Sequence, residues 1–130
     1  NDLLAYKGRP LEGIWASPPF LHNGSVPTLF DLLLPPEKRP SRFSLGTREY
    51  DPEKVGYVYE ASKEEFKSAD AKRDNKFVFN TIDSDGNPII GNSNAGHDYG
   101  NAEFSDEQRY WLVEYMKAIS GTRQGNIVVP

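Results

Sequence analysis

The sequence predicts a mainly α, loop-rich fold with few regular elements. The clearest signal is a C-terminal helix near 105–120, where Ser105 and Gln108 form a Ser-x-x-Gln capping box. Asp106 and Glu107 lie in its first turn, where the helix dipole favours negative charge. Ten prolines and eleven glycines indicate long loops between the remaining elements.

One face of this C-terminal segment carries apolar residues at helical spacing. They are Leu112, Tyr115, Met116 and Ile119, with Trp111 beside them. Gly121 follows at the position where a glycine commonly ends a helix. We therefore expect the helix to pack this face against the rest of the chain.

A second, short helix is expected near 28–34. Ser25 or Thr28 could cap its start, and the Pro-Pro pair at 35–36 would stop it. The following Pro-rich residues, up to 54, are expected to run irregularly over the surface.

Weak alternation of apolar and polar residues predicts a small β-hairpin near 56–80. Its strands would be residues 56–59 and 76–80, with a charged, solvated segment at 61–74 between them. Residues 83–86, Asp-Ser-Asp-Gly, predict a tight turn.

Composition bounds the classes of function. Hydrophobic residues make up 37% of the 130 residues, so the core should be modest, and 1–130 is a single domain or part of one. The net charge of −4 and the lack of a basic run disfavour nucleic acid as a partner. The longest apolar run, at 32–34, is too short for a transmembrane segment. The chain starts at Asn1 without a leader, so we expect a processed product or a piece of a longer protein.

Two segments carry most of the functional information. Residues 9–29 include Pro-Pro-Phe-Leu-His-Asn-Gly-Ser, and residues 91–100 read Gly-Asn-Ser-Asn-Ala-Gly-His-Asp-Tyr-Gly. The first segment resembles the Pro-Tyr-Phe-His-Asp-Gly-Ser motif of the di-haem cytochrome c peroxidase superfamily, and both fit the branch that contains the di-haem rubber oxygenases. The resemblance implies a cytochrome c-like fold, haem binding and one-electron transfer in a periplasmic or otherwise extracytoplasmic protein. The implied partner is a redox protein or a second haem domain.

His97 is the first candidate metal ligand. It lies in a loop rich in Gly and Asn, where an imidazole can project freely, and neutral imidazole is a common ligand of iron. From the residues alone, the simpler interpretation is an exposed histidine without a role. The resemblance implies that His97 is the distal axial ligand of a haem.

His22 is the second candidate, in a turn formed with Asn23 and Gly24. The resemblance places it close to a haem without fixing whether it binds the iron. The alternative is a buried histidine that bonds to backbone carbonyls and holds the loop.

Three further residues would surround the cofactor. The resemblance implies that Arg9 pairs with a haem propionate, since guanidinium binds carboxylate in a bidentate way. Trp15 and Phe20 would form apolar walls around the ring, although aromatic residues more commonly pack in a core. An ordinary surface arginine is the alternative for Arg9.

The sequence contains no cysteine, so it cannot supply the Cys-x-x-Cys-His motif that attaches haem c. The expected cofactor is therefore haem c attached through a segment that is not present in this chain. Two other functions stay open. The chain could line the active site of a haem peroxidase or oxygenase, or it could be a haem-free binding module on a cytochrome scaffold.

Overall fold

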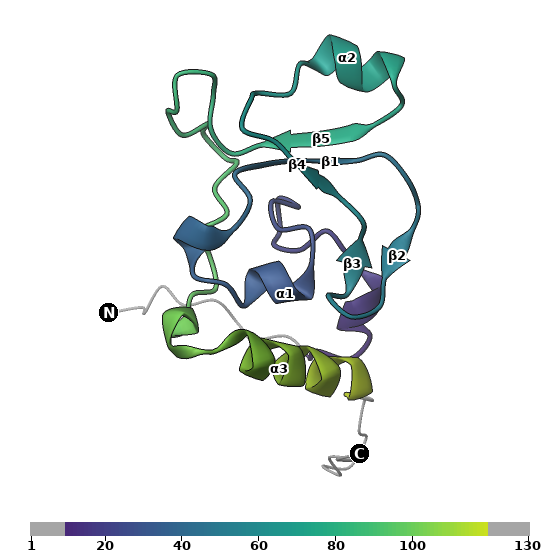
Figure 1. Cartoon of the computed structure of the whole chain (residues 1–130), viewed down its shortest axis with the longest axis vertical. Helices are drawn as coiled ribbons and strands as arrows, with labels where there is room; N and C mark the ends of the chain where they lie inside the picture. Colours follow the sequence, from purple (N-terminus) through teal and green to yellow (C-terminus); the bar gives the residue numbers. More distant parts are fainter. Residues whose placement is uncertain (1–9, 120–130) are drawn as a thin grey trace, which may run out of the picture.

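The structure, a computed structural model, describes residues 10–119 and contains short strands and one long helix in that range. The helices are α1 (Leu29–Leu32), α2 (Ser68–Arg73) and α3 (Asp106–Ala118), with 3-10 turns at Ile14–Ala16, Pro36–Lys38 and Asn101–Glu103. The strands are β1 (Arg42–Leu45), β2 (Tyr50–Asp51), β3 (Gly56–Tyr57), β4 (Glu60–Ala61) and β5 (Phe77–Asn80). Figure 1 shows α1 in the middle of the molecule, with α3 along one side and β1 and β5 on the other.

The expectation of a mainly α fold is wrong. The strands form two antiparallel sheets, β4-β1-β5 and β2-β3, and β1 and β2 lie in the region expected to be irregular. The physical reason lies in β1, where the polar residues Arg42 and Ser44 are buried and mask the alternation that signals a strand. The Arg42 guanidinium is satisfied by donating to the carbonyls of Ile82, Lys63 and Asp83.

The expected hairpin near 56–80 is also wrong, because its two strands have other partners. β5 pairs with β1, and the rings of Phe43 and Phe79 stack with centroids 5.7 Å apart. β3 pairs with the nearby β2. Gly56 in β3 lies so close to the backbone before α1 that an added Cβ would be 2.4 Å from the Pro27 carbonyl oxygen. A glycine is therefore required where β3 crosses the start of α1.

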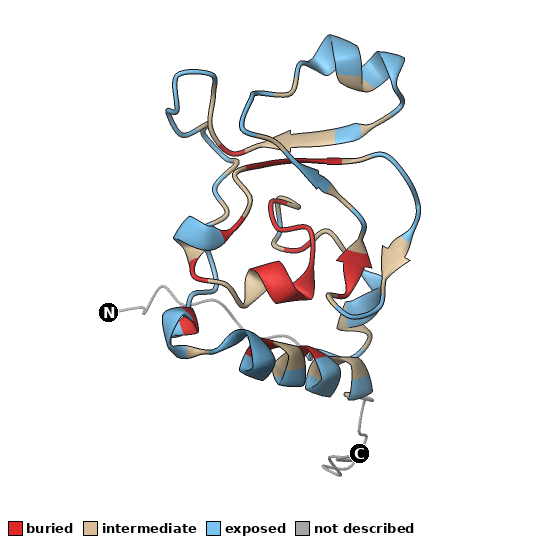
Figure 2. Ribbon diagram, viewed as in Figure 1, coloured by how far each residue is buried: buried red, intermediate tan, exposed pale blue. Residues whose placement is uncertain are grey.

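The short helix is confirmed at Leu29–Leu32, shorter than expected. Thr28 is its N-cap, and its Oγ1 accepts a hydrogen bond of 3.1 Å from the Asp31 amide. Leu29 and Phe30 project into the main core, which comprises Phe20, Val26, Leu29, Phe30, Val55 and Val113. Figure 2 shows the buried residues concentrated in and around α1.

The C-terminal helix is confirmed, including both hydrogen bonds of the Ser105–Gln108 capping box. Its buried face differs from the expected one, since α3 presents Arg109, Tyr110, Val113 and Met116 to the core. Trp111 is 61% exposed on the outer side, together with Tyr115. The helix carries apolar residues on both sides, so spacing alone did not identify the packed one. The expected cap Gly121 lies outside the described residues.

None of the helices within residues 10–119 is long and apolar enough to cross a membrane.

A buried carboxyl links α1 to the segment before β4. Asp31 is 3% exposed, and it accepts hydrogen bonds from the Thr28 hydroxyl at 2.6 Å and the Tyr59 hydroxyl at 3.1 Å. Burial raises the pKa of Asp31. The two hydrogen bonds lower this pKa, as do the positive charges of the nearby Lys54 and Arg39, but together they offset the effect of burial only in part. Burial and the adjacent Asp31 also raise the pKa of Tyr59.

This network predicts a pH dependence of stability. A pKa that is higher in the folded state means that folding favours protonated Asp31. Its stabilising contribution is full below the unfolded-state pKa, near 3.8, and is lost as the pH rises through the folded-state pKa. Urea unfolding of wild type and Asp31→Asn should show the variant gaining stability relative to wild type as the pH rises from about 4 through the raised folded-state pKa of Asp31. The exposed Asp85→Asn variant controls for the change of charge, and a pH-independent difference for Asp31→Asn would contradict the prediction.

Candidate functional site

The two segments singled out in the sequence lie against each other in the structure. The Asn23 amide donates to the carbonyls of Gly91 at 3.0 Å and Ser93 at 2.8 Å. The Ser25 hydroxyl also donates to the Ser93 carbonyl, at 3.0 Å. The turn that contains His22 and the loop that contains His97 therefore form one continuous surface unit, which we call the paired loops (residues 20–25 and 91–101).

A buried arginine holds the paired loops to the end of α1. Arg39 is only 4% exposed. Its side chain donates to backbone carbonyls at the end of α1 and in the loop of His97. The acceptors are the carbonyls of Leu32, Leu34, Asn94, Gly96 and His97. Burial lowers the pKa of Arg39, while the carboxylates of Asp98, Asp31 and Glu37 oppose that shift. Since arginine remains protonated in proteins, Arg39 acts as a fixed cation with all its bonds directed at backbone oxygens.

Asn101 reinforces the same junction. Its side-chain amide donates to the carbonyls of Leu32 at 3.0 Å, Leu34 at 3.1 Å and His97 at 3.3 Å. Arg109 in α3 then donates to the Asn101 carbonyl at 2.8 Å and the Leu33 carbonyl at 3.0 Å. The end of α1, the paired loops and the start of α3 are thus fixed to one another by side chain–backbone hydrogen bonds.

His97 combines a fixed backbone with an exposed side chain. Its carbonyl accepts from both Arg39 and Asn101, and its imidazole lies in solvent. Its φ of 57° is in the left-handed region, which is costly for a residue with a Cβ. The Nδ1 atom of His97 lies 3.1 Å from the Tyr99 hydroxyl oxygen, so one ring nitrogen has a partner in the loop. The second ring nitrogen, Nε2, forms no hydrogen bond with the described residues, and the residue is exposed.

His22 is exposed as well, in a turn where Gly24 has a φ of 71° and Leu21 a φ of 63°. The interpretation of His22 as a buried residue that holds the loop is therefore wrong. The neighbouring Asn23 holds the loop instead. No hydrogen bond joins the two histidine side chains within residues 10–119.

The other predicted site residues have different environments. Phe20 is buried in the main core, whereas Trp15 is 49% exposed. The backbone carbonyl of Trp15 accepts from the Tyr50 hydroxyl at 2.7 Å. Arg9 lies outside the described residues. The structure thus brings the segments of His22 and His97 together and keeps Phe20 in the interior.

Sequence reasoning missed Arg39, Asn23 and Asn101, the residues that position the paired loops. No local pattern marks them, because every acceptor of Arg39 in the loop is more than fifty positions away in the sequence. Asn23 was visible only as a turn residue. Their roles depend on tertiary contacts.

The described residues contain no group of three or more His, Cys, Asp or Glu side chains that could hold a bare metal ion. A haem makes a smaller demand, because the porphyrin supplies the equatorial nitrogens and the protein supplies only axial ligands. The exposed His97 with its supported Nδ1 fits that requirement. The chain lacks cysteine, so any thioether attachment would involve residues beyond these 130.

Comparison with known proteins supports a cytochrome c-like module. Residues 5–44, which contain Trp15, Phe20, His22 and Arg39, match a family model described as RoxA-like, cytochrome c-like. The chain is 43% identical over 124 residues to the uncharacterized protein y4iJ of Sinorhizobium fredii, covering 89% of this chain and 18% of that protein. It is 53% identical over 53 residues to the uncharacterized protein y4iM of the same organism, covering 41% of this chain and 12% of that protein. The chain therefore spans less than a fifth of the length of either relative.

The Arg39 contacts predict a large and specific loss of stability on substitution. Arg39→Met would leave the carbonyls of Asn94 and Gly96 without a donor. It would also remove one of the two side-chain donors from the carbonyls of Leu32, Leu34 and His97. We therefore expect the free energy of unfolding to fall by about 3 kcal/mol. Arg73→Met, on the exposed α2, should leave it nearly unchanged, because exposed ion pairs contribute little to stability. Urea unfolding followed by circular dichroism gives both values. Equal losses in the two variants would show that Arg39 does not hold the junction.

Proposed function

We propose that the chain is part of the haem-binding, electron-transfer module of a c-type cytochrome, with His97 as the distal axial ligand of the iron. The observation that carries this proposal is the exposed imidazole of His97 on a loop whose backbone is fixed by Arg39 and Asn101. The cytochrome c-like match at residues 5–44 supports the same class of protein.

The residues of the chain suit this role through their hydrogen bonds. If Nε2 of His97 binds the iron, its Nδ1 carries the ring proton and donates it toward the Tyr99 hydroxyl oxygen, 3.1 Å away. That bond fixes the tautomer and the ring orientation. Arg39 and Asn101 hold the backbone from which the ring projects, which limits the ordering required on binding.

When bound between two axial histidines, a haem supplies one-electron transfer and has no open position for oxygen or peroxide. The chain has no cysteine. We therefore propose that the proximal histidine and the thioether attachment are supplied by a segment outside the 130 residues. The resemblance supports an extracytoplasmic location. It also supports a redox protein or a second haem domain as the partner.

The test is the spectrum of the haem-loaded protein. Replacing His97 with Ala removes a strong-field axial ligand, so we expect one low-spin haem to become high-spin in the absorption spectrum. His22→Ala is the matched control, because His22 is exposed in the other of the paired loops, and it should keep the low-spin spectrum. A low-spin spectrum that persists in His97→Ala would refute the assignment. A change in His22→Ala instead would assign the iron to His22.

The contact between His97 and Tyr99 predicts a shift in redox potential. A ring nitrogen that donates a hydrogen bond makes the imidazole a stronger electron donor, which favours ferric iron. Tyr99→Phe removes the acceptor, so the midpoint potential should rise while the spectrum stays low-spin. A redox titration of the wild type and the variant measures the difference. An unchanged or lower potential would contradict the proposed role of Tyr99.

A further inference from the structure

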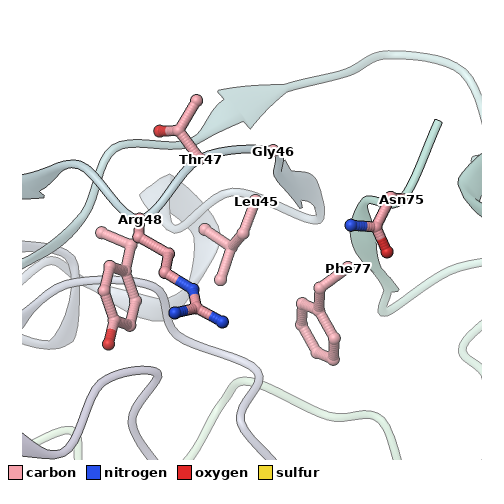
Figure 3. Close-up of a pocket in the computed structure, with 7 residues that line it drawn as sticks. Leu45, Gly46, Thr47, Arg48, Asn75 and Phe77 are labelled. Atoms are coloured by element: carbon pink, nitrogen blue, oxygen red, sulfur yellow. The ribbon is translucent and has the colours of Figure 1, made fainter.

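A solvent-open hollow of about 490 Å³ lies beside the end of the β1–β5 ladder. Its walls come from the end of β1 and the loop that follows, from β3, and from the connection between α2 and β5. Figure 3 shows the side chains that surround it. The volume falls in the range of pockets that bind small molecules, about 300–1,000 Å³.

The floor of the hollow is apolar. Leu45 and Phe77 are direct partners in the β1–β5 ladder, so their side chains lie next to each other on one face. The same face continues into the buried ring of Phe43, whose centroid is 6.4 Å from that of Phe77. Phe77 itself is 48% exposed. An apolar group placed in the hollow would therefore cover a ring that now faces water.

The guanidinium of Arg48 lines the hollow beside its apolar floor, and it has no partner among the described residues. Within residues 10–119, the arginines at 39, 42, 73 and 109 all form hydrogen bonds or ion pairs, whereas Arg48 forms none. Figure 3 shows the Arg48 guanidinium directed into the space between Leu45 and Phe77. The nearby Lys76 is already paired with Glu60 at 3.3 Å. The hollow thus offers a single uncompensated cation.

Asn75 places a polar group at the same rim. Its φ of 51° is in the left-handed region and turns the chain from the end of α2 back into β5. Its side-chain amide forms no hydrogen bond with the described residues, and it lies above Phe77 in Figure 3. The amide is therefore available to a ligand that occupies the hollow.

We propose that this hollow binds a small organic monoanion, namely a carboxylate with an apolar aryl or alkyl body. The body would cover Phe77 and Leu45, and the carboxylate would pair with Arg48, whose planar fork matches two carboxylate oxygens. A neutral ligand would gain the apolar contact alone. A polyanion would find only one free cation. The site requires no haem and is independent of the function proposed above.

The test uses 2-naphthoate as the anionic probe and 2-naphthalenemethanol as its neutral counterpart. Titrations of the full chain followed by amide NMR should show saturable shifts at Gly46, Thr47 and Asn75, with 2-naphthoate binding more tightly than the alcohol. Arg48→Gln should weaken 2-naphthoate binding by about tenfold or more and leave the alcohol unchanged. Arg48→Lys should recover only part of the affinity.

Arg73→Gln is the matched control, because it removes the same charge from the exposed α2 and should not alter binding of either probe. Phe77→Ala should weaken both probes. Well-dispersed amide spectra establish that each variant is folded. Equal affinities for the anion and the alcohol, the same loss in Arg48→Gln and Arg73→Gln, or the absence of saturable shifts at these amides would each overturn the proposal.

Discussion

Hydrogen bonds from buried guanidinium groups to backbone carbonyls are the interaction on which the rest of the structure depends. Arg39, Arg42 and Arg109 are each buried, and each joins segments that are distant in the sequence. The main apolar core is small, so these hydrogen bonds add to apolar burial in fixing the long connections. A guanidinium has five donors in a rigid fork, and one such side chain can satisfy several loop carbonyls that would otherwise be buried without partners.

This mode of attachment positions the backbone of the His97 loop without using the His97 side chain. Arg39 and Asn101 hold the loop of His97 entirely through its carbonyl oxygens. The imidazole takes no part in that support, so it is available for chemistry. A residue that had to hold its own loop by side-chain contacts, as in the alternative interpretation of His22, would lose that freedom.

Local features of the fold could be predicted from the sequence, whereas pairings between distant segments could not. The Ser105–Gln108 box and the start of α1 at Thr28 depend on hydrogen bonds within one turn. The box was predicted, and Thr28 was one of the two candidate caps. The pairing of β5 with β1 depends on residues more than thirty positions apart and on the burial of Arg42 and Ser44. For the candidate site, the histidines were visible as residue types in glycine-rich loops. The contact between their loops through Asn23 was not visible, because a turn asparagine has no sequence signal for a distant acceptor.

The two tryptophans of the protein, Trp15 and Trp111, both lie at the surface, and neither belongs to the main core. Indole emission responds to the water around the ring, so the intrinsic fluorescence of this protein reports on its surface more than on its interior. Unfolding would change the surroundings of these rings modestly, because both are already about half in solvent. A partner or cofactor that covered the outer side of α3 would change the emission of Trp111 directly. The protein therefore carries its own optical probe for contacts on that helix.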